Sequence, residues 1–308
     1  MMMKYESLKA YPKIFLRATG LHLSEFDALY ADVEAAFLLA ESKRLSRANR
    51  QRAIGGGLSP DLEARDQILL TLLWLRLYPV HDLLGYFFGI SQPTVGRYLG
   101  RVLPVLEAAG QDTMRLPDPG RKRRKQLPEL LKDLPELGII IDSFEQKVQK
   151  PREQEEADSY YSRKKKAHTL KSQIAVHPET GYIAAISQSV KGRTADMTLL
   201  KDSQLLDEIP AEMALSGDKG YQGIAKLREN GFSPRKKPWG KDKPLSEADK
   251  DYNRAFSQHR IIVENSINRL RRYQALKQTD RQHRKGHEAR VVAVAGLVNR
   301  QLAARMPL

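Results

Sequence analysis

Hydrophobic positions in the first third of the chain recur with helical spacing, and punctuating residues divide them into three pieces. Ser59-Pro60-Asp61 is typical of a helix start, and Pro79 ends the apolar stripe that follows it. A second, short helix is predicted over residues 81–88, because Gly89 can close it in a left-handed conformation. Ser91 can cap a third helix that carries a regular apolar stripe. The pattern predicts a helix, a short helix, a sharp turn and a helix.

A helix-turn-helix uses this order of elements to place the start of its last helix in the major groove of DNA. Small polar and arginine side chains at that start can meet base edges or phosphates. The predicted DNA contacts on the third helix are Gln92, Thr94, Arg97, Tyr98 and Arg101. A plain three-helix bundle with a solvated charged face has the same pattern, so both interpretations stay open at this point.

From Leu137 onward the pattern changes to short apolar runs that are typical of strands. Gly138 to Asp142 predicts a buried strand that ends in a carboxylate, and residues 174–177 and 182–187 predict a hairpin. A short strand over residues 213–216 leads into a glycine-bracketed turn. The other expected elements are helices over residues 24–40, 196–206, 223–230, 246–274 and 285–304 and a strand over residues 232–236. These elements predict an α/β (α+β) fold preceded by an all-α region.

The composition adds a preference for polyanionic partners. Lysine and arginine number 52 against 37 acids in 308 residues, a net charge of +15 that favours nucleic acid, with an acidic membrane surface as the weaker alternative. No cysteine is present, which excludes disulfides, cysteine-bound zinc, iron–sulfur clusters and thiol nucleophiles. Neither an export signal nor a membrane span is expected, so the sequence favours a cytoplasmic or nuclear protein.

Three carboxylates occupy unusual places in the predicted elements. Asp142 follows an apolar strand, Asp218 follows a second strand inside the glycine-bracketed turn, and Glu264 lies in a strongly basic helix. If these acids converge, they supply the hard oxygen ligands that Mg²⁺ or Mn²⁺ prefers, and two such ions can promote phosphodiester cleavage. The alternatives are ordinary: an aspartate at a strand end is commonly a turn former, and Glu264 could pair with Arg260 within its helix.

Basic and polar side chains near the three acids are further candidates for contact with DNA. A basic loop enters the second predicted strand, two residues neighbour Asp218, and one face of the long helix is polar and basic around Glu264. The predicted contacts are Lys164, Lys165, Lys166, His168 and Lys171 in the loop, Lys219 and Tyr221 beside Asp218, and Arg260, Asn268 and Arg271 on the helix. For the loop, a merely solvated segment is the alternative.

Four stretches of this sequence resemble transposases of the IS5 group, within the DDE superfamily of bacterial insertion sequences. They read IIIDSFE, YYSRKKKAHTLKSQIAVHPETG, GDKGYQG and HRIIVENSINRLRR. The resemblance implies an RNase H-like mixed sheet flanked by helices, with Asp142 on the first strand, Asp218 after the fourth and Glu264 on a following helix. It also implies two Mg²⁺ or Mn²⁺ ions, and water and then a DNA 3′-hydroxyl as successive nucleophiles.

The resemblance departs from the family pattern around the third acid. The IS5 and IS4 groups share a tyrosine, arginine, glutamate and lysine signature, of which Arg260 and Glu264 fit. Ser257 stands at the tyrosine position and Arg271 at the lysine position. Arginine keeps the charge but not the geometry of a flexible ammonium, so the departures concern contact with DNA rather than metal binding.

Together the pattern and the resemblance divide the chain into four parts. Residues 1–57 are an N-terminal helix and basic linker, and 58–110 the helix-turn-helix domain. Residues 111–135 are a basic, proline-containing linker, and 136–308 the catalytic domain.

The function implied is that of an insertion-sequence transposase. Such a protein binds terminal inverted repeats, cleaves DNA by two-metal hydrolysis and joins the 3′ ends to target DNA. The expected partners are double-stranded DNA, from the transposon ends and the target, and a second copy of the chain on that DNA; no membrane partner is expected. The expected location is the bacterial cytoplasm, at the nucleoid. Two alternatives are a catalytically silent DNA-binding protein and a metal-dependent nuclease without strand transfer.

Overall fold

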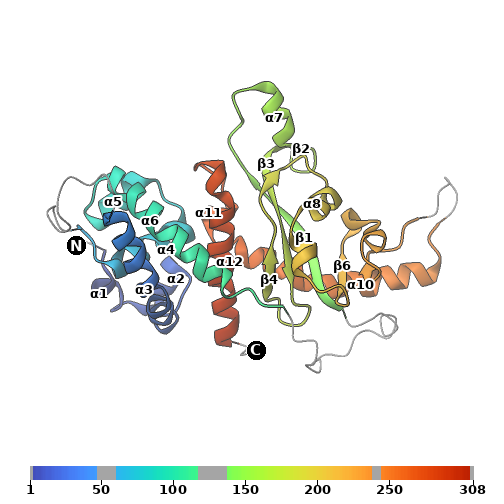
Figure 1. Ribbon diagram of the computed structural model, residues 1–308, viewed down its shortest axis with the longest axis horizontal. Helices are drawn as coiled ribbons and strands as arrows, with labels where there is room; N and C mark the ends of the chain where they lie inside the picture. Colours follow the sequence, from blue (N-terminus) through green and yellow to red (C-terminus); the bar gives the residue numbers. More distant parts are fainter. Residues whose placement is uncertain (1–2, 47–59, 117–136, 238–243, 306–308) are drawn as a thin grey trace. The chain divides into compact units, whose positions relative to one another are not determined.

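The computed structural model describes residues 3–46, 60–116, 137–237 and 244–305. The chain forms two compact units, drawn in Figure 1. The first, here the helical unit, comprises residues 1–113, 270–278 and 282–308. The second, here the sheet unit, comprises residues 114–269 and 279–281. This division differs from the expected one, which assigned the whole chain after residue 136 to a single domain.

The helical unit contains every helix before residue 113 and the last helices of the chain. Aromatic side chains form much of its core, and Phe15, Phe26 and Trp74 are almost completely buried. Its helices are α1 (Tyr5–Leu8), α2 (Pro12–Thr19), α3 (Leu23–Leu45), α4 (Ala64–Leu77), α5 (His81–Phe88), α6 (Gln92–Gln111), α11 (Gln274–Lys277), η4 (Arg284–Gly286) and α12 (His287–Arg305). The sequence analysis predicted α3 too short and did not predict α1 and α2.

The three expected helices of the helix-turn-helix are present as α4, α5 and α6. Gly89 ends α5 with φ 68°, in the left-handed conformation expected of it, and α6 begins directly after Ser91. The first helix starts later than predicted, at Ala64. Leu62 precedes it in a bend, is buried, and accepts a hydrogen bond from the Gln67 side chain at its carbonyl oxygen. The turn signals therefore located α5 and α6 correctly and placed the start of α4 a few residues early.

Helix α12 belongs to the helical unit because it packs closely against α6. Its apolar run Val291 to Val298 is buried, and a Cβ on Gly296 would stand 2.3 Å from the Cα of Gly110. A Cβ on Gly110 would in turn stand 2.6 Å from the Val292 carbonyl oxygen. Two glycines in register thus let the helix backbones approach more closely than any side chain would allow.

The sheet unit is built on a mixed sheet, which confirms the expected α/β class. Its order is β2-β3-β1-β6-β7, with β4 and β5 also paired to β3. β1 runs antiparallel to β3 and parallel to β6, and β6 runs parallel to β7. The strands are β1 (Leu137–Lys147), β2 (Tyr161–Ser162), β3 (Ala167–Val176), β4 (Ile183–Ile186), β5 (Val190–Lys191), β6 (Ala214–Gly217) and β7 (Gly231–Phe232).

Helices and short turns complete the sheet unit around an apolar core on β1 and β6. Ile139, Ile141 and Leu215 are buried there. The other elements are α7 (Gln154–Tyr160), α8 (Asp196–Asp202), α9 (Leu205–Glu208), η2 (Lys219–Tyr221), η3 (Ile224–Lys226) and α10 (Glu247–Leu270). Figure 1 shows α10 as the long helix of this unit.

Several boundaries in the sheet unit differ from the predicted ones. β1 does not end at Asp142 but runs on to Lys147, because β3 pairs with it as far as Thr169. The helix expected over residues 196–206 is split into α8 and α9, and the one expected over residues 223–230 is a single 3₁₀ turn. The strand expected over residues 232–236 is only the short β7.

Parts of both expected linkers lie outside the described residues, which exclude 47–59 and 117–136. Within the described ranges, none of the helices combines the length and apolar character needed to cross a bilayer.

Candidate active site

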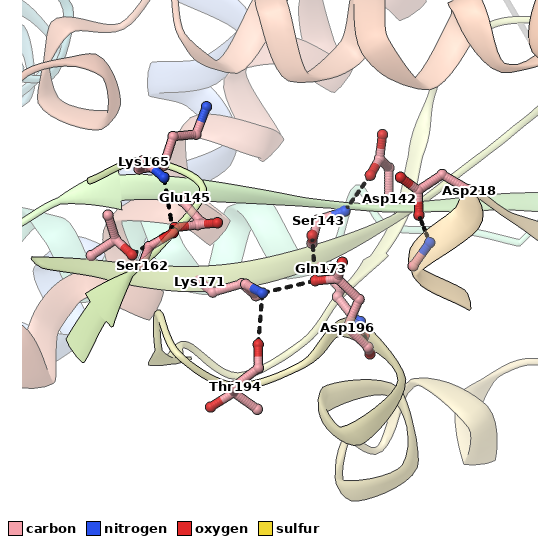
Figure 2. A network of polar contacts seen from close by, with 12 residues as sticks. Asp142, Ser143, Glu145, Ser162, Lys165, Lys171, Gln173, Thr194, Asp196 and Asp218 are labelled. Atoms are coloured by element: carbon pink, nitrogen blue, oxygen red, sulfur yellow. Dashed lines mark hydrogen bonds and ion pairs between the residues drawn. The ribbon is translucent and has the colours of Figure 1, made fainter. Parts of the chain in front are cut away.

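Two of the three predicted acids are brought together by the register of the sheet. β1 and β6 run parallel, with Ile141 paired to Gly217. The next residues, Asp142 and Asp218, therefore emerge at the same level of neighbouring strands, and Figure 2 shows their carboxylates close to one another. The pKa of Asp142 is consistent with this proximity, because the negative charge of Asp218 contributes to raising it.

Asp142 is a largely buried carboxylate with one cationic partner. Its Oδ1 accepts a hydrogen bond from the Ser143 backbone N–H at 2.8 Å, and its Oδ2 accepts one from Nη2 of Arg260 at 3.1 Å. Desolvation by burial is the largest influence and raises the pKa of Asp142, whereas the Arg260 guanidinium opposes that rise. Arg260 thus partly neutralises a position whose burial and acidic neighbour disfavour negative charge.

The turn around Asp218 depends on two glycines. A Cβ on Gly217 would stand 2.6 Å from the Tyr221 ring, so the ring can pack on the strand end only against glycine. A Cβ on Gly220 would stand 2.6 Å from Oδ2 of Asp196 and 2.9 Å from Oδ1 of Asp218. The same Oδ1 accepts the Gly220 backbone N–H at 2.7 Å. Gly220 therefore leaves a small space between two carboxylates.

The sequence analysis did not single out Asp196, which organises the polar network beside Asp142 (Figure 2). One of its carboxylate oxygens accepts hydrogen bonds from Oγ of Ser143 at 2.8 Å and from Nζ of Lys171 at 2.9 Å. Its backbone carbonyl accepts the Gln173 side-chain amide at 2.7 Å. In sequence, Asp196 is only an acid at the start of a helix, and nothing local distinguishes it from an ordinary N-terminal aspartate.

Two predicted DNA contacts are instead buried in this network. Lys171 is 7% exposed and donates both to Asp196 and to the Thr194 carbonyl oxygen at 2.6 Å, so its ammonium is engaged within the protein. Tyr221 is fully buried, and burial together with the charges of Asp196, Asp142 and Asp218 raises its pKa well above the usual value. Burial therefore leaves these two side chains little surface for the predicted contact with DNA.

The third predicted acid does not join the pair. Glu264 is exposed on α10, one turn beyond Arg260, and within the part of the chain that the structure describes no contact links it to Asp142 or Asp218. Among those residues, no three or more histidine or acidic side chains form a cluster with a metal-binding arrangement. The expected convergence of all three acids is therefore not observed. Asp142 and Asp218 fit a divalent cation, since they are adjacent carboxylates and the surroundings of Asp142 disfavour its negative charge.

Comparison with known proteins identifies the family. Residues 141–299, just over half of the chain and including all three acids, match the family described as DDE superfamily endonuclease. The chain belongs to the DDE superfamily endonucleases. Residues 60–112 match the helix-turn-helix of DDE superfamily endonucleases, which agrees with the fold of α4 to α6. These matches establish the superfamily, whose nucleases generally use divalent metal ions, and they do not single out the IS5 group.

A curated relative supports the same assignment. Over 257 residues, 83% of this chain and 87% of the relative, the sequence is 28% identical to a protein of Microchaete diplosiphon named "Probable transposase for insertion sequence element IS702". No solved structure matches this endonuclease chain.

In the helix-turn-helix of this endonuclease, the predicted DNA contacts fall into two groups. Gln92 and Arg97 are exposed at the start of α6, and Arg97 donates to Oγ1 of Thr94 at 3.0 Å. Tyr98 is 3% exposed, which leaves little of its side chain for the predicted contact with DNA. Arg101 lies over the Tyr98 ring and 3.7 Å from Glu41, and is therefore partly engaged within the unit.

The predicted DNA contacts of the endonuclease domain also include exposed side chains and side chains that contact other parts of the protein. Lys164, Lys165 and Lys166 are exposed in the turn between β2 and β3, and His168 packs edge-on against Tyr161. Lys219 and Asn268 are also exposed. Arg260 is turned to Asp142. Arg271 follows the last residue of α10 and groups with the helical unit, so it does not continue the α10 face as predicted.

Proposed function

We propose that this DDE superfamily endonuclease is an insertion-sequence transposase. In this proposal it binds terminal inverted repeats, cleaves the DNA with divalent metal ions and joins the 3′ ends to target DNA at the bacterial nucleoid. The observation that carries the proposal is the pairing of Ile141 with Gly217, which places Asp142 and Asp218 side by side. The printed name of the relative from Microchaete diplosiphon supports the transposase assignment over other endonuclease activities.

In the proposed reaction, the protein positions one phosphodiester bond at the paired aspartates. Asp142 and Asp218 would hold Mg²⁺ or Mn²⁺, with Glu264 as the proposed third donor. Two such ions supply an activated attacking oxygen and stabilise the leaving one. The oxygen of water forms a bond to phosphorus while the bond from phosphorus to O3′ breaks, which frees a 3′-hydroxyl. That hydroxyl then attacks a phosphodiester of target DNA, and a target 3′-hydroxyl leaves.

The residues around the aspartates have supporting roles in this proposal. Lys171 keeps Asp196 neutralised and in place, and Asp196 in turn anchors Ser143 beside Asp142. The Ser143 backbone N–H orients one Asp142 oxygen toward the sheet, which leaves the other oxygen for Arg260 or for a cation. Tyr221 is buried near Asp142, Asp196 and Asp218 and excludes water from that part of the site.

Recognition of the transposon ends is assigned to the helix-turn-helix. Gln92, Thr94 and Arg97 lie at the start of α6, the part of a recognition helix that enters the major groove. Arg97 is the strongest candidate for base readout, because arginine can donate two parallel hydrogen bonds to guanine. Two ends must be joined in one reaction, so we propose at least a dimer on DNA.

The direct test uses the purified full-length chain, DNA ends taken from the sequences that flank its gene, and a plasmid target. Cleavage and joined products are measured with Mg²⁺ or Mn²⁺ and with EDTA. Asp218→Asn is expected to abolish both products while end binding, followed by gel shift, is retained. The matched control is Asp207→Asn, an exposed aspartate in the same unit, which should leave both reactions unchanged.

The outcomes separate the three functional interpretations. Metal-dependent cleavage with joined product supports the transposase proposal, and cleavage alone indicates a nuclease without strand transfer. Specific end binding without metal-dependent chemistry indicates a silent DNA-binding protein. Loss of end binding in Asp218→Asn would contradict the separation of recognition from catalysis.

A further inference from the structure

A pocket formed partly by the segments that follow Asp196 and Asp218 is rimmed by positive charge. It encloses about 400 Å³ and lies within the sheet unit. Lys201, Lys226 and Lys236 stand around it, and Met197, Leu227 and Gln222 supply the rest of its side-chain surface. None of the residues that line it is acidic. A volume of this size lies within the range of small-molecule sites in proteins, which is roughly 300–1,000 Å³.

The three lysines come from three separate segments and are free in the described part of the chain. Lys201 is on α8, Lys226 is on η3 and Lys236 follows β7; all three side chains are exposed. None of these three ammonium groups forms a hydrogen bond or an ion pair with another described residue. Like charges gathered around one pocket repel one another, and a bound anion with several oxygens relieves that repulsion.

The segment that carries Lys236 is held in place by polar contacts on both sides. The Gln222 side-chain amide donates to the Pro234 carbonyl oxygen, which ties the segment to the turn that follows Asp218. Asn253 on α10 accepts the Arg235 backbone N–H at 2.7 Å and donates to the Arg235 carbonyl oxygen at 3.2 Å. The lysine is therefore presented from a fixed backbone and not from a free end.

Two residues that line the pocket are close in sequence to acids of the candidate active site. Met197 directly follows Asp196, and Gln222 lies four residues after Asp218. Helix α8 and the turn η2 are also in contact. A strand of DNA bound at the aspartates would therefore pass its neighbouring backbone over this pocket.

We propose that this pocket, hereafter the lysine pocket, binds the sugar–phosphate backbone of the DNA strand next to the cleaved bond. Lys201, Lys226 and Lys236 hold the phosphate oxygens, and Met197 and Leu227 contact the deoxyribose. The inference rests on the proposed function, because it requires DNA to be the substrate of the sheet unit. It adds a contact that the sequence analysis did not predict.

The test measures how DNA binding depends on salt. Fluorescence anisotropy follows a labelled duplex carrying the DNA that flanks the gene, in EDTA, at a series of salt concentrations. The double variant Lys201→Gln with Lys226→Gln is compared with Lys150→Gln plus Lys250→Gln, two exposed lysines that do not line the pocket. Both variants lose the same charge. The slope of log K against log salt should fall by about 1 to 2 in the pocket variant only.

A second arm locates the contact on the DNA. Neutral methylphosphonates replace single phosphates near the cleavage position, one duplex at a time. One replacement should weaken binding by the wild-type chain several-fold and should have no further effect on the pocket variant. If the pocket and control variants have the same slope, or if the methylphosphonate penalty is equal in both proteins, the lysine pocket does not bind the backbone.

The inference and the proposed function fail in different ways. Wild-type protein that cleaves DNA, combined with an unchanged salt slope in the pocket variant, overturns the inference alone. Wild-type protein that neither binds nor cleaves the flanking DNA overturns both. Cleavage lost in Asp218→Asn, with a reduced slope in the pocket variant, supports both.

Discussion

The ion pair between Arg260 and Asp142 makes a quantitative prediction about the candidate active site. Arg260→Gln removes the guanidinium that donates to Asp142 Oδ2 at 3.1 Å. Both side chains are only 15% exposed, so water compensates little for the loss. The buried carboxylate then keeps its desolvation cost without its cationic partner, and the pKa of Asp142 rises further above its usual value.

The expected loss of stability lies between two known limits. Exposed ion pairs contribute about 0–1 kcal/mol, and removal of one partner from a fully buried pair costs about 3–5 kcal/mol. For a pair with this small residual exposure we expect the variant to lose about 2 kcal/mol. In a unit of this size that corresponds to a melting midpoint lower by about 4–8 °C.

Differential scanning calorimetry of the full chain measures this effect, first in EDTA and then with MgCl₂ or MnCl₂. A divalent cation at Asp142 and Asp218 replaces the missing positive charge, so it should raise the midpoint more in Arg260→Gln than in wild type. Arg254→Gln is the control, because this arginine lies on the same helix in an ion pair that is 72% and 44% exposed. It should shift the midpoint little, since such pairs contribute less than about 1 kcal/mol.

Two results would refute this reasoning. A midpoint in EDTA that is the same for Arg260→Gln and Arg254→Gln would mean that the buried ion pair stabilises nothing. Equal metal-induced stabilisation of wild type and Arg260→Gln would mean that Arg260 and the cation do not compete for Asp142.

Three further predictions concern the helical unit. Gly296→Ala should destabilise it by about 1–3 kcal/mol in urea unfolding, because the new Cβ would stand 2.3 Å from the Gly110 Cα; an unchanged midpoint would contradict that close packing. Burial lowers the pKa of His287 to about 3, below its unfolded value near 6.5. Between these pH values the unfolded chain binds a proton that the folded chain does not, so the free energy of unfolding falls as pH drops, by up to about 1.4 kcal/mol per pH unit. In urea unfolding at pH 7 and pH 5, His287→Gln should lose less stability between the two pH values than wild type. An equal loss in both proteins would contradict the lowered pKa of His287. Arg97→Ala should weaken binding to the end duplex by about 1–3 kcal/mol and to unrelated DNA much less, as measured by anisotropy; equal losses would assign Arg97 to phosphate contact.

The comparison of predicted and observed elements separates two kinds of information. Gly89 and Ser91 marked the boundaries of α5 and α6 correctly, because caps and left-handed positions depend only on a few neighbouring residues. The end of β1 was predicted too early, since its last residues are ordered by pairing with β3 and not by their own apolar pattern. The short 3₁₀ turn η3 was predicted as a longer helix, and it ends at Lys226.

In the candidate site, too, some residues were identified from the sequence and others only from the structure. Charge and placement in the sequence identified Asp142 and Asp218 as unusual acids. They also marked Lys171 and Tyr221 as substrate contacts, although burial engages both within the protein. Asp196 was missed because its partners, Ser143 and Lys171, lie on strands far away in the chain.

By itself the sequence determined the helix-turn-helix, the mixed α/β class and the two acids that follow or occupy strands, because each depends on short-range periodicity and turn chemistry. Only the tertiary structure decided that Asp142 and Asp218 meet, that Arg260 partly neutralises Asp142 and that the last helix packs with the first unit. Strand register and helix packing set those relations. Both depend on the simultaneous burial of segments that are distant in the chain, which no local pattern encodes.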